Sequence, residues 1–196
     1  MKIKPSNSSE WEKVNGDNTY RINYNLNNNS IVVDLGARHG NWSDLIRQKY
    51  SPKIYCFELV DSFCSELRAK GYETFCTAVT DKNEEITVGV FESEASIFYN
   101  ESSFNVKSIP ASDIFNLIQN DKIDLLKINV EGAEYPILKH LIITNNITKI
   151  KNIQVQFHLF QGEENNEYES IANNLSKTHF LTWRFPFVWE NWELKF

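Results

Sequence analysis

The sequence predicts an α/β fold in which a mostly parallel sheet carries helices on both faces. Apolar stretches rich in β-branched and aromatic residues alternate with stretches whose apolar residues recur at helical spacing. Neither a linker nor an internal repeat interrupts this alternation. Alternating strands and helices are typical of parallel sheets, because two parallel neighbours need a crossover connection. The length of 196 residues fits one domain with a sizeable core.

The expected strands start with residues 31–33, an unbroken β-branched run suited to a strand buried on both faces. Near the C-terminus a short aromatic turn joins two candidates, which favours an antiparallel hairpin. The alternating rings Trp183, Phe185, Phe187 and Trp189 favour burial against helices, with a stacking platform for a sugar or a dimer contact as the alternative. In order, strands are expected at residues 30–35, 53–58, 73–79, 85–91, 123–129, 150–158, 179–187 and 190–196.

Helices are expected between these strands. After Gly40, the residues Trp42, Leu45 and Ile46 recur at helical spacing. Residues 1–29 are polar and asparagine-rich, and they predict an N-terminal extension or lid ahead of a domain of residues 30–196. Further helices are expected from Asp61 to Gly71, after Ser112, over residues 133–143 and around Tyr168, Ile171 and Leu175.

The turn after the first strand predicts a cofactor site. Asp34 and Gly36 end the strand and Gly40 precedes the helix, so free backbone N–H groups face a crevice. The spacing is G-x-x-x-G rather than the dinucleotide fingerprint G-x-G-x-x-G. An acid beside this turn repels a pyrophosphate but attracts the ammonium group of S-adenosylmethionine (SAM). Glu58 ends the next strand, where doubly wound folds place a ribose-binding carboxylate; the alternative is that Asp34 caps a turn and Glu58 is a solvated strand end.

Polar residues also end the strand expected at 123–129. Lys127, Asn129 and Glu131 share one side of that strand if it extends so far. Three polar groups on one side of a buried strand are costly unless they are paired or face a site. The alternative is an ion pair between Lys127 and Glu131, with Asn129 bonded to a loop.

Composition narrows the function classes. A net charge of -6 without a basic cluster argues against nucleic acid as the main partner. The chain has no apolar run near the roughly 20 residues that span a bilayer, and its N-terminus lacks a secretory apolar core. Cys56, Cys64 and Cys76 are an odd set without metal-ligand spacing, so we expect reduced core thiols in a cytoplasmic protein.

The segments DLGARHGNWS, IYCFEL and DLLKINVEGAE resemble the FkbM family of SAM-dependent methyltransferases. That family reads close to D-x-G-A-N-x-G-x-x-S, F-E-P and LKIDVEGAE. The resemblance covers roughly residues 30–160, and KINVEGAE is its most specific part. It implies the class I methyltransferase (Rossmann-like) fold, a seven-stranded, mostly parallel sheet with a C-terminal antiparallel hairpin and helices on both faces. It also implies SAM as cofactor and methyl transfer to hydroxyl groups, often on sugars or polyketides.

The resemblance further implies roles for single residues. Three positions depart from the family pattern: Arg38 replaces Asn, Leu59 replaces Pro and Asn129 replaces Asp. The last departure matters most, because an amide replaces a carboxylate poorly as a base or metal ligand. The implied cofactor-binding residues are Asp34, Gly36, Gly40, Ser43, Glu58, Leu59, Ala78 and Asn129, and the catalytic candidates are Glu131, His158 and Lys127, without a metal.

We therefore expect an O-methyltransferase that acts on a hydroxyl of a sugar or glycan-like acceptor, as a monomer or homodimer. Either Glu131 or His158 is the expected base, His158 because it ends a strand at the same sheet edge and has a suitable pKa. One alternative is methyl transfer to another small-molecule hydroxyl. The other is a SAM-binding protein whose catalysis is weak or lost because of Asn129.

Overall fold

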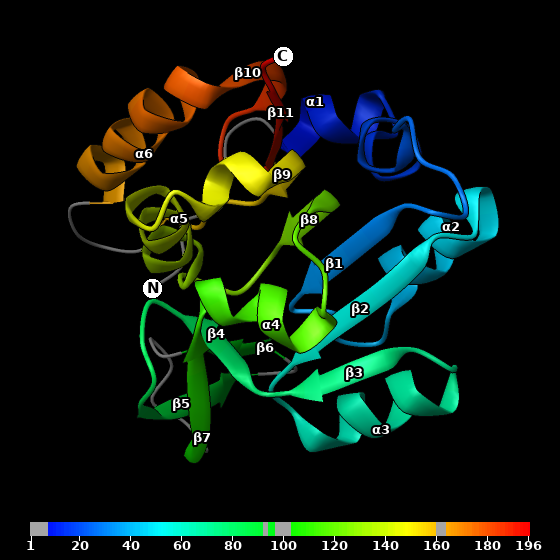
Figure 1. The fold of residues 1–196 in the computed structure, drawn as a ribbon, viewed down its shortest axis with the longest axis vertical. Helices are drawn as coiled ribbons and strands as arrows, with labels where there is room; N and C mark the ends of the chain where they lie inside the picture. The colour runs from blue at the N-terminus through cyan, green and yellow to red at the C-terminus, as the bar shows by residue number, and fades with distance from the viewer. Residues whose placement is uncertain (1–7, 92–93, 97–102, 160–163) are drawn as a thin grey trace.

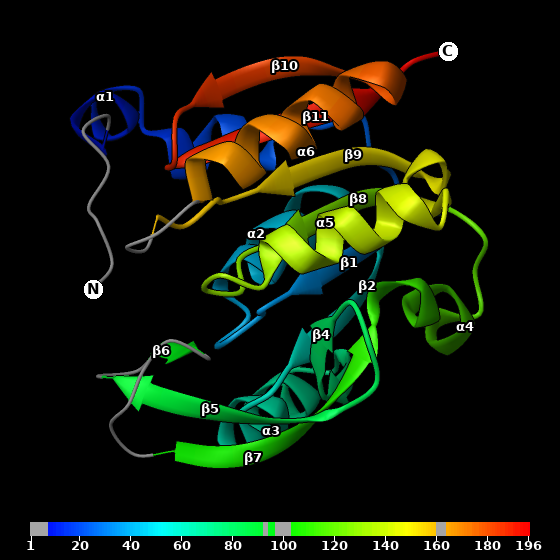
Figure 2. The ribbon, with the colours of Figure 1, turned by 90° about the vertical axis from the view of Figure 1, so that its left-hand side faces the viewer.

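A computed structural model describes residues 8–91, 94–96, 103–159 and 164–196. A seven-stranded sheet with helices on both faces forms the centre of the fold (Figures 1 and 2). From β9 to β3 all neighbours pair in parallel, whereas β11 is antiparallel to both β9 and β10. The predicted fold class is confirmed. In spatial order the strands are β10 (His179–Phe185), β11 (Trp189–Leu194), β9 (Ile150–Val155), β8 (Ile123–Ile128), β1 (Ile31–Leu35), β2 (Lys53–Glu58) and β3 (Glu73–Cys76).

Helices bury two apolar cores against the two faces of this sheet. On β1, Val32 packs in the core that includes α2, while Val33 packs in the core that includes α5. Successive side chains thus serve opposite faces, as a strand requires. One face carries α2 (Asn41–Tyr50) and α3 (Asp61–Ala69), and the other carries α4 (Ile114–Ile118), α5 (Glu134–Ile143) and α6 (Glu164–Thr178), with short 3-10 turns at Ala111–Asp113 and Asn146–Lys149.

A second, four-stranded sheet lies between β3 and α4 in the sequence, and the sequence analysis missed it. The single strand expected at 73–79 is two strands, because β3 stays in the main sheet and the next strand leaves it. The strand expected at 85–91 is present but belongs to this second sheet. Figure 2 shows it below the main sheet. Its order is β4 (Ala78–Thr80), β7 (Ser103–Pro110), β5 (Glu85–Phe91) and β6 (Glu94–Ser96).

The N-terminal segment packs on the main sheet. It contains α1 (Ser8–Lys13) and two 3-10 turns, Gly16–Asn18 and Tyr20–Ile22. The guanidinium carbon of Arg21 lies 3.9 Å from the ring centre of Trp189, and its Nε donates to Gln154 Oε1 at 3.2 Å. Trp11 packs edge-on against Phe185, with ring centres 5.0 Å apart. The division of the chain at residue 30 stays a prediction.

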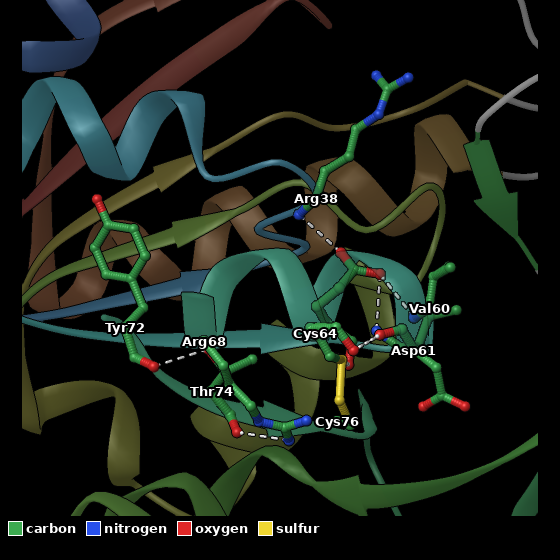
Figure 3. The surroundings of a disulfide bond; sticks show 11 residues. Arg38, Val60, Asp61, Cys64, Arg68, Tyr72, Thr74 and Cys76 are labelled. Atoms are coloured by element: carbon green, nitrogen blue, oxygen red, sulfur yellow. Dashed lines mark hydrogen bonds between the residues drawn. A yellow bond between two sulfur atoms is a disulfide. The ribbon is translucent and has the colours of Figure 1, made fainter. Parts of the chain in front are cut away.

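Two of the three cysteines differ from the expectation of reduced thiols. Cys64 on α3 and Cys76 at the end of β3 form a disulfide with their Cα atoms 6.0 Å apart (Figure 3). Only Cys56 is a free, buried thiol. The sequence could not show the pairing, because α3 must first fold back onto β3 to bring the two residues together. No helix in the described part of the chain is long and apolar enough to cross a membrane. The cytoplasmic location stays a prediction.

Candidate functional site

A cavity of about 330 Å³ lies at the carboxyl ends of β1, β2 and β8. This volume is in the range of small-molecule sites. Ile86 and Val88 of the second sheet form part of its wall. Of the predicted site residues, six line the cavity: Gly36, Glu58, Leu59, Ala78, Asn129 and Glu131. The other five lie outside its lining: Asp34, Gly40, Ser43, Lys127 and His158.

Gly36 forms the turn from β1 toward the cavity. Its φ of 75° is left-handed, and a Cβ at this position would collide with the backbone carbonyl oxygen of Asn129. Its N–H donates to the carbonyl of Phe57 at 2.9 Å. Gly40 ends the turn with the same φ, and a Cβ there would lie 2.8 Å from Leu67 Cδ2. The left-handed backbone and the short distances to Asn129 and Leu67 therefore require glycine at both positions.

Asp34, Ser43 and Lys127 form a buried network beneath this turn. Lys127 Nζ lies 2.8 Å from Asp34 Oδ1, and Ser43 Oγ donates to Asp34 Oδ2 at 2.7 Å. Lys127 also donates to the carbonyl of Gly36 at 2.9 Å. The ion pair of Lys127 is therefore with Asp34 and not with Glu131, the partner considered from the sequence. Both Asp34 oxygens are engaged, so the network holds the turn in place.

The Glu58 carboxylate lies on the cavity wall and organises the loop after β2. Its Oε1 accepts hydrogen bonds from the backbone N–H groups of Leu59 at 2.8 Å and Val60 at 2.9 Å. Its Oε2 accepts one from the N–H of Arg38 at 2.8 Å (Figure 3). A carboxylate oxygen can accept a second bond, so Oε2 keeps capacity for a ligand hydroxyl.

Asn129 carries a buried acceptor at the same wall. Its backbone N–H donates to the carbonyl of Leu35 at 3.1 Å, which fixes the residue beside the turn. Its side-chain oxygen Oδ1 is buried and has no hydrogen-bond partner among the described residues. A buried polar atom without a partner costs about 1–3 kcal/mol. A ligand that donates a hydrogen bond here would remove this cost.

His158 lies between two carboxylates behind the cavity. Its Nε2 is 3.2 Å from Glu131 Oε1, and its Nδ1 is 3.0 Å from Glu134 Oε1. The His158 and Glu134 side chains are 2% and 0% exposed, whereas Glu131 is 14% exposed and reaches the cavity. Glu131 itself has a left-handed backbone, with φ at 51°.

Burial acts to lower the pKa of His158, but the negative charge of Glu134 and the bonds from both carboxylates outweigh it and raise this pKa to about 9. The imidazole is therefore protonated at neutral pH. This raised pKa differs from the near-neutral value on which the expected role of His158 as a base rested. Glu134 was not among the predicted site residues, because in the sequence it is an ordinary acid in the first turn of a helix.

The sequence matches the model of the methyltransferase FkbM domain over residues 18–182. The chain belongs to the FkbM methyltransferase family. SAM is its cofactor, and it is a SAM-dependent methyltransferase. No curated protein matches this FkbM methyltransferase.

Solved structures show which fold this FkbM methyltransferase has. The METTL16 methyltransferase domain is similar with 8% sequence identity and a TM-score of 0.53, over 99% of this chain and 71% of that chain. An rRNA methylase from Streptococcus thermophilus is similar with 12% identity and a TM-score of 0.51, over 92% of this chain and 94% of that chain. Both similarities support the class I SAM methyltransferase fold.

The cavity of this FkbM methyltransferase fits SAM chemically. SAM offers an ammonium donor, which suits the unsatisfied Asn129 Oδ1, and a ribose diol, which suits the Glu58 carboxylate. The apolar side chains of Leu59, Ala78 and Val79 line the same cavity and suit an adenine ring.

Proposed function

We propose that this FkbM methyltransferase transfers a methyl group from SAM to a hydroxyl of a sugar or glycan-like acceptor. The observation that carries the proposal is the Glu131 carboxylate, which reaches the cavity wall from the loop after β8, two residues from Asn129. A hydroxyl is a poor acid, so its methylation gains from a positioned base, typically ~10²–10⁴-fold. The net charge of -6 supports a neutral or small acceptor over a nucleic acid.

The cofactor-binding roles follow from the contacts. Asn129 Oδ1 accepts a hydrogen bond from the ammonium group, Glu58 binds the ribose hydroxyls, and Leu59 and Ala78 flank the adenine. Asp34, Ser43 and Lys127 have a different role from the one that the resemblance implies. They hold the Gly36 turn from below, a role supported by their burial and by their position outside the cavity lining.

The bound cofactor supplies an activated methyl group on a sulfonium. Glu131 accepts the proton of the acceptor hydroxyl while the oxygen attacks the methyl carbon. Ile86 and Val88 close the cavity from the second sheet and exclude water from the reacting groups. The absence of a metal from the reaction, which the sequence analysis expected, stays a prediction.

The test is methyl transfer from SAM labelled with ¹³C at the methyl group. The acceptor panel contains mono- and oligosaccharides, their deoxy analogues, amino sugars, non-sugar alcohols and an RNA oligonucleotide. We expect a methyl ether at one sugar hydroxyl, located by NMR, and no product from the analogue that lacks that hydroxyl. Labelling of an amine or of RNA, or of non-sugar alcohols alone, would contradict the proposed acceptor.

The amide of Asn129, where the family has a carboxylate, supports a second candidate function: a SAM-binding protein with weak or lost turnover. The two candidates differ in what Asn129→Asp does. If Asn129 only accepts a hydrogen bond from the cofactor, this variant leaves turnover no higher than in the wild-type protein. Turnover that appears only in Asn129→Asp, with SAM bound equally well by both proteins, would establish the non-catalytic candidate.

A further inference from the structure

We propose that Glu134 is a positioning residue that keeps His158 as an imidazolium, and that this imidazolium fixes the Glu131 carboxylate at the cavity wall. The inference rests on the proposed function, because Glu131 is the base there. It adds two residues behind that base and assigns His158 the role of a permanent hydrogen-bond donor.

Glu134 is a fully buried carboxylate that joins two loops. Its Oε2 accepts a hydrogen bond from the N–H of Gly132 at 2.8 Å, in the loop after β8. Its Oε1 accepts one from the backbone N–H of His158 at 2.6 Å and lies 3.0 Å from His158 Nδ1. One buried charge thus ties the loop that carries Glu131 to the segment that carries His158. An ionised carboxylate at 0% exposure needs such donors and a nearby positive charge.

The groups around His158 favour its protonated form. In the part of the chain that the structure describes, the titratable groups facing it are Glu131 from the loop after β8 and Glu134 and Tyr135 from α5. The Tyr135 hydroxyl donates to the backbone carbonyl of His158 at 2.9 Å. From α6, the uncharged ring of Tyr168 packs against Phe157, with ring centres 4.9 Å apart. Two carboxylates therefore act on one imidazole, and they raise its pKa to about 9 although burial opposes this.

The imidazolium in turn positions Glu131. With both ring nitrogens protonated, Nδ1 donates to Glu134 and Nε2 forms an ion pair with Glu131 Oε1 at 3.2 Å. Glu131 has a left-handed backbone that residues with side chains rarely adopt, so its direction needs support from such a contact. Its partial exposure leaves the carboxylate within reach of the cavity.

The proton and electron balance of the transfer leaves His158 unchanged. The acceptor oxygen forms a bond to the methyl carbon, the carbon–sulfur bond breaks, and its electron pair stays on sulfur. The hydroxyl proton passes to the Glu131 carboxylate and then to solvent. His158 keeps both its protons throughout, because its two acceptors are both carboxylates.

The test is an NMR titration of the His158 side chain in SAM-free protein, with the signal assigned from a His158→Gln variant. In the wild-type protein we expect a midpoint near 9. In Glu134→Gln it should fall by roughly 1–3 pH units, because a neighbouring opposite charge is lost. Glu134→Asp should restore part of the shift. The matched control is Glu66→Gln, which removes the carboxylate 2.7 Å from His39 on the surface and should leave His158 unchanged.

Turnover provides a second readout, with the acceptor identified in the ¹³C panel. In Glu134→Gln we expect kcat to fall at unchanged SAM affinity, and the alkaline limb of kcat to move to lower pH together with the His158 midpoint, because the imidazolium that positions Glu131 then loses its proton at lower pH. A purely structural role of Glu134 would not shift that limb. An unshifted limb overturns the inference.

The titration needs no acceptor, so the two proposals can fail separately. A wild-type midpoint near 6.5 together with measurable methyl transfer overturns this inference and leaves the proposed function standing. A midpoint near 9 that falls in Glu134→Gln supports the inference about position even if the acceptor class proves different. If Glu134→Gln does not fold, the wild-type midpoint and Glu134→Asp still decide.

Discussion

Single residues at the ends of three neighbouring strands line one side of the cavity. Gly36 and Asn129 follow β1 and β8, and Glu58 is the last residue of β2, so the parallel sheet brings the three to one edge. Gly36 is the most constrained of them, because it has a left-handed backbone directly against the carbonyl of Asn129. Its lack of a side chain lets the two loops approach each other.

Gly36→Ala should weaken SAM binding by at least about tenfold, which corresponds to about 1.4 kcal/mol. The added methyl group meets backbone rather than a flexible side chain, so the turn must move. Calorimetry with SAM measures the loss. Gly71→Ala is the matched control, because Gly71 also has a left-handed backbone but open space around it. Wild-type affinity in Gly36→Ala would show that the turn does not shape the site.

Residues that end strands were placed correctly at one edge of the sheet, whereas contacts between residues distant in the sequence were not predicted. Lys127 was expected on the side of Asn129 and Glu131, but β8 ends at Ile128, so strand alternation does not extend to the later two. Lys127 instead faces Asp34. The role of Glu134 depends on His158, 24 residues away, and no local pattern reveals that contact.

Among the elements, α3 and β3 are linked in a way that the composition did not suggest. The disulfide joins Cys64 of α3 to Cys76, the residue before Thr77 and Ala78 at the cavity (Figure 3). Tyr72 begins the return from α3, and its N–H donates to the carbonyl of Leu67 at 3.1 Å. An odd number of cysteines in a sequence leaves open which of them pair.

We expect one free thiol per chain when the protein is purified without reductant and then denatured. Cys56 is that thiol, and in the folded protein it should react slowly, because it is buried. Thiol titration and mass spectrometry of non-reduced peptides give the count and the pairing. Three reactive thiols in the denatured protein would show that all three cysteines are reduced, as expected from the sequence, and would contradict the disulfide.

The second sheet contains a strand, β7, that was not among those expected from the sequence. In β7 the residues from Ser103 to Lys107 alternate between exposed and half-buried positions, and most of them are polar. Phe104 and Val106 alternate with polar residues, which is the pattern of a half-buried strand, although the apolar run that marked the strands of the main sheet is absent. The antiparallel pairing of this strand with β5 was therefore open to prediction from that alternation.

At the scale of the whole molecule, the order of strands and helices was predictable and the packing between sheets was not. Alternating strands and helices allow few topologies, so local patterns predicted a mostly parallel sheet, and the family resemblance implied its seven strands. The N-terminal segment covers polar side chains of β9, such as Gln154, and a polar strand face gives no signal that it is buried. Ile86 and Val88 of the second sheet line the cavity, and that sheet was not predicted from sequence patterns.

Protein stability should decrease at alkaline pH because of His158. Its folded-state pKa of about 9 lies above the ordinary value of 6.5, so the folded chain holds a proton that the unfolded chain releases. This contribution is fully present below about pH 6.5 and is lost as the pH rises through about 9, with a size on the order of 3 kcal/mol. Urea unfolding across this range measures it. In Glu134→Gln the dependence should be flatter, and an equal slope in both proteins would contradict the assignment.

The most direct test of the central claim is the effect of Glu131→Gln on turnover and on SAM affinity, measured on the same preparations. Loss of a base that acts in the transition state should lower kcat by about 10²–10⁴-fold while the SAM dissociation constant stays within about twofold. His158→Asn, measured alongside, should bind SAM normally and retain more turnover, since His158 holds the base and does not take the proton. Full turnover in Glu131→Gln would contradict the account.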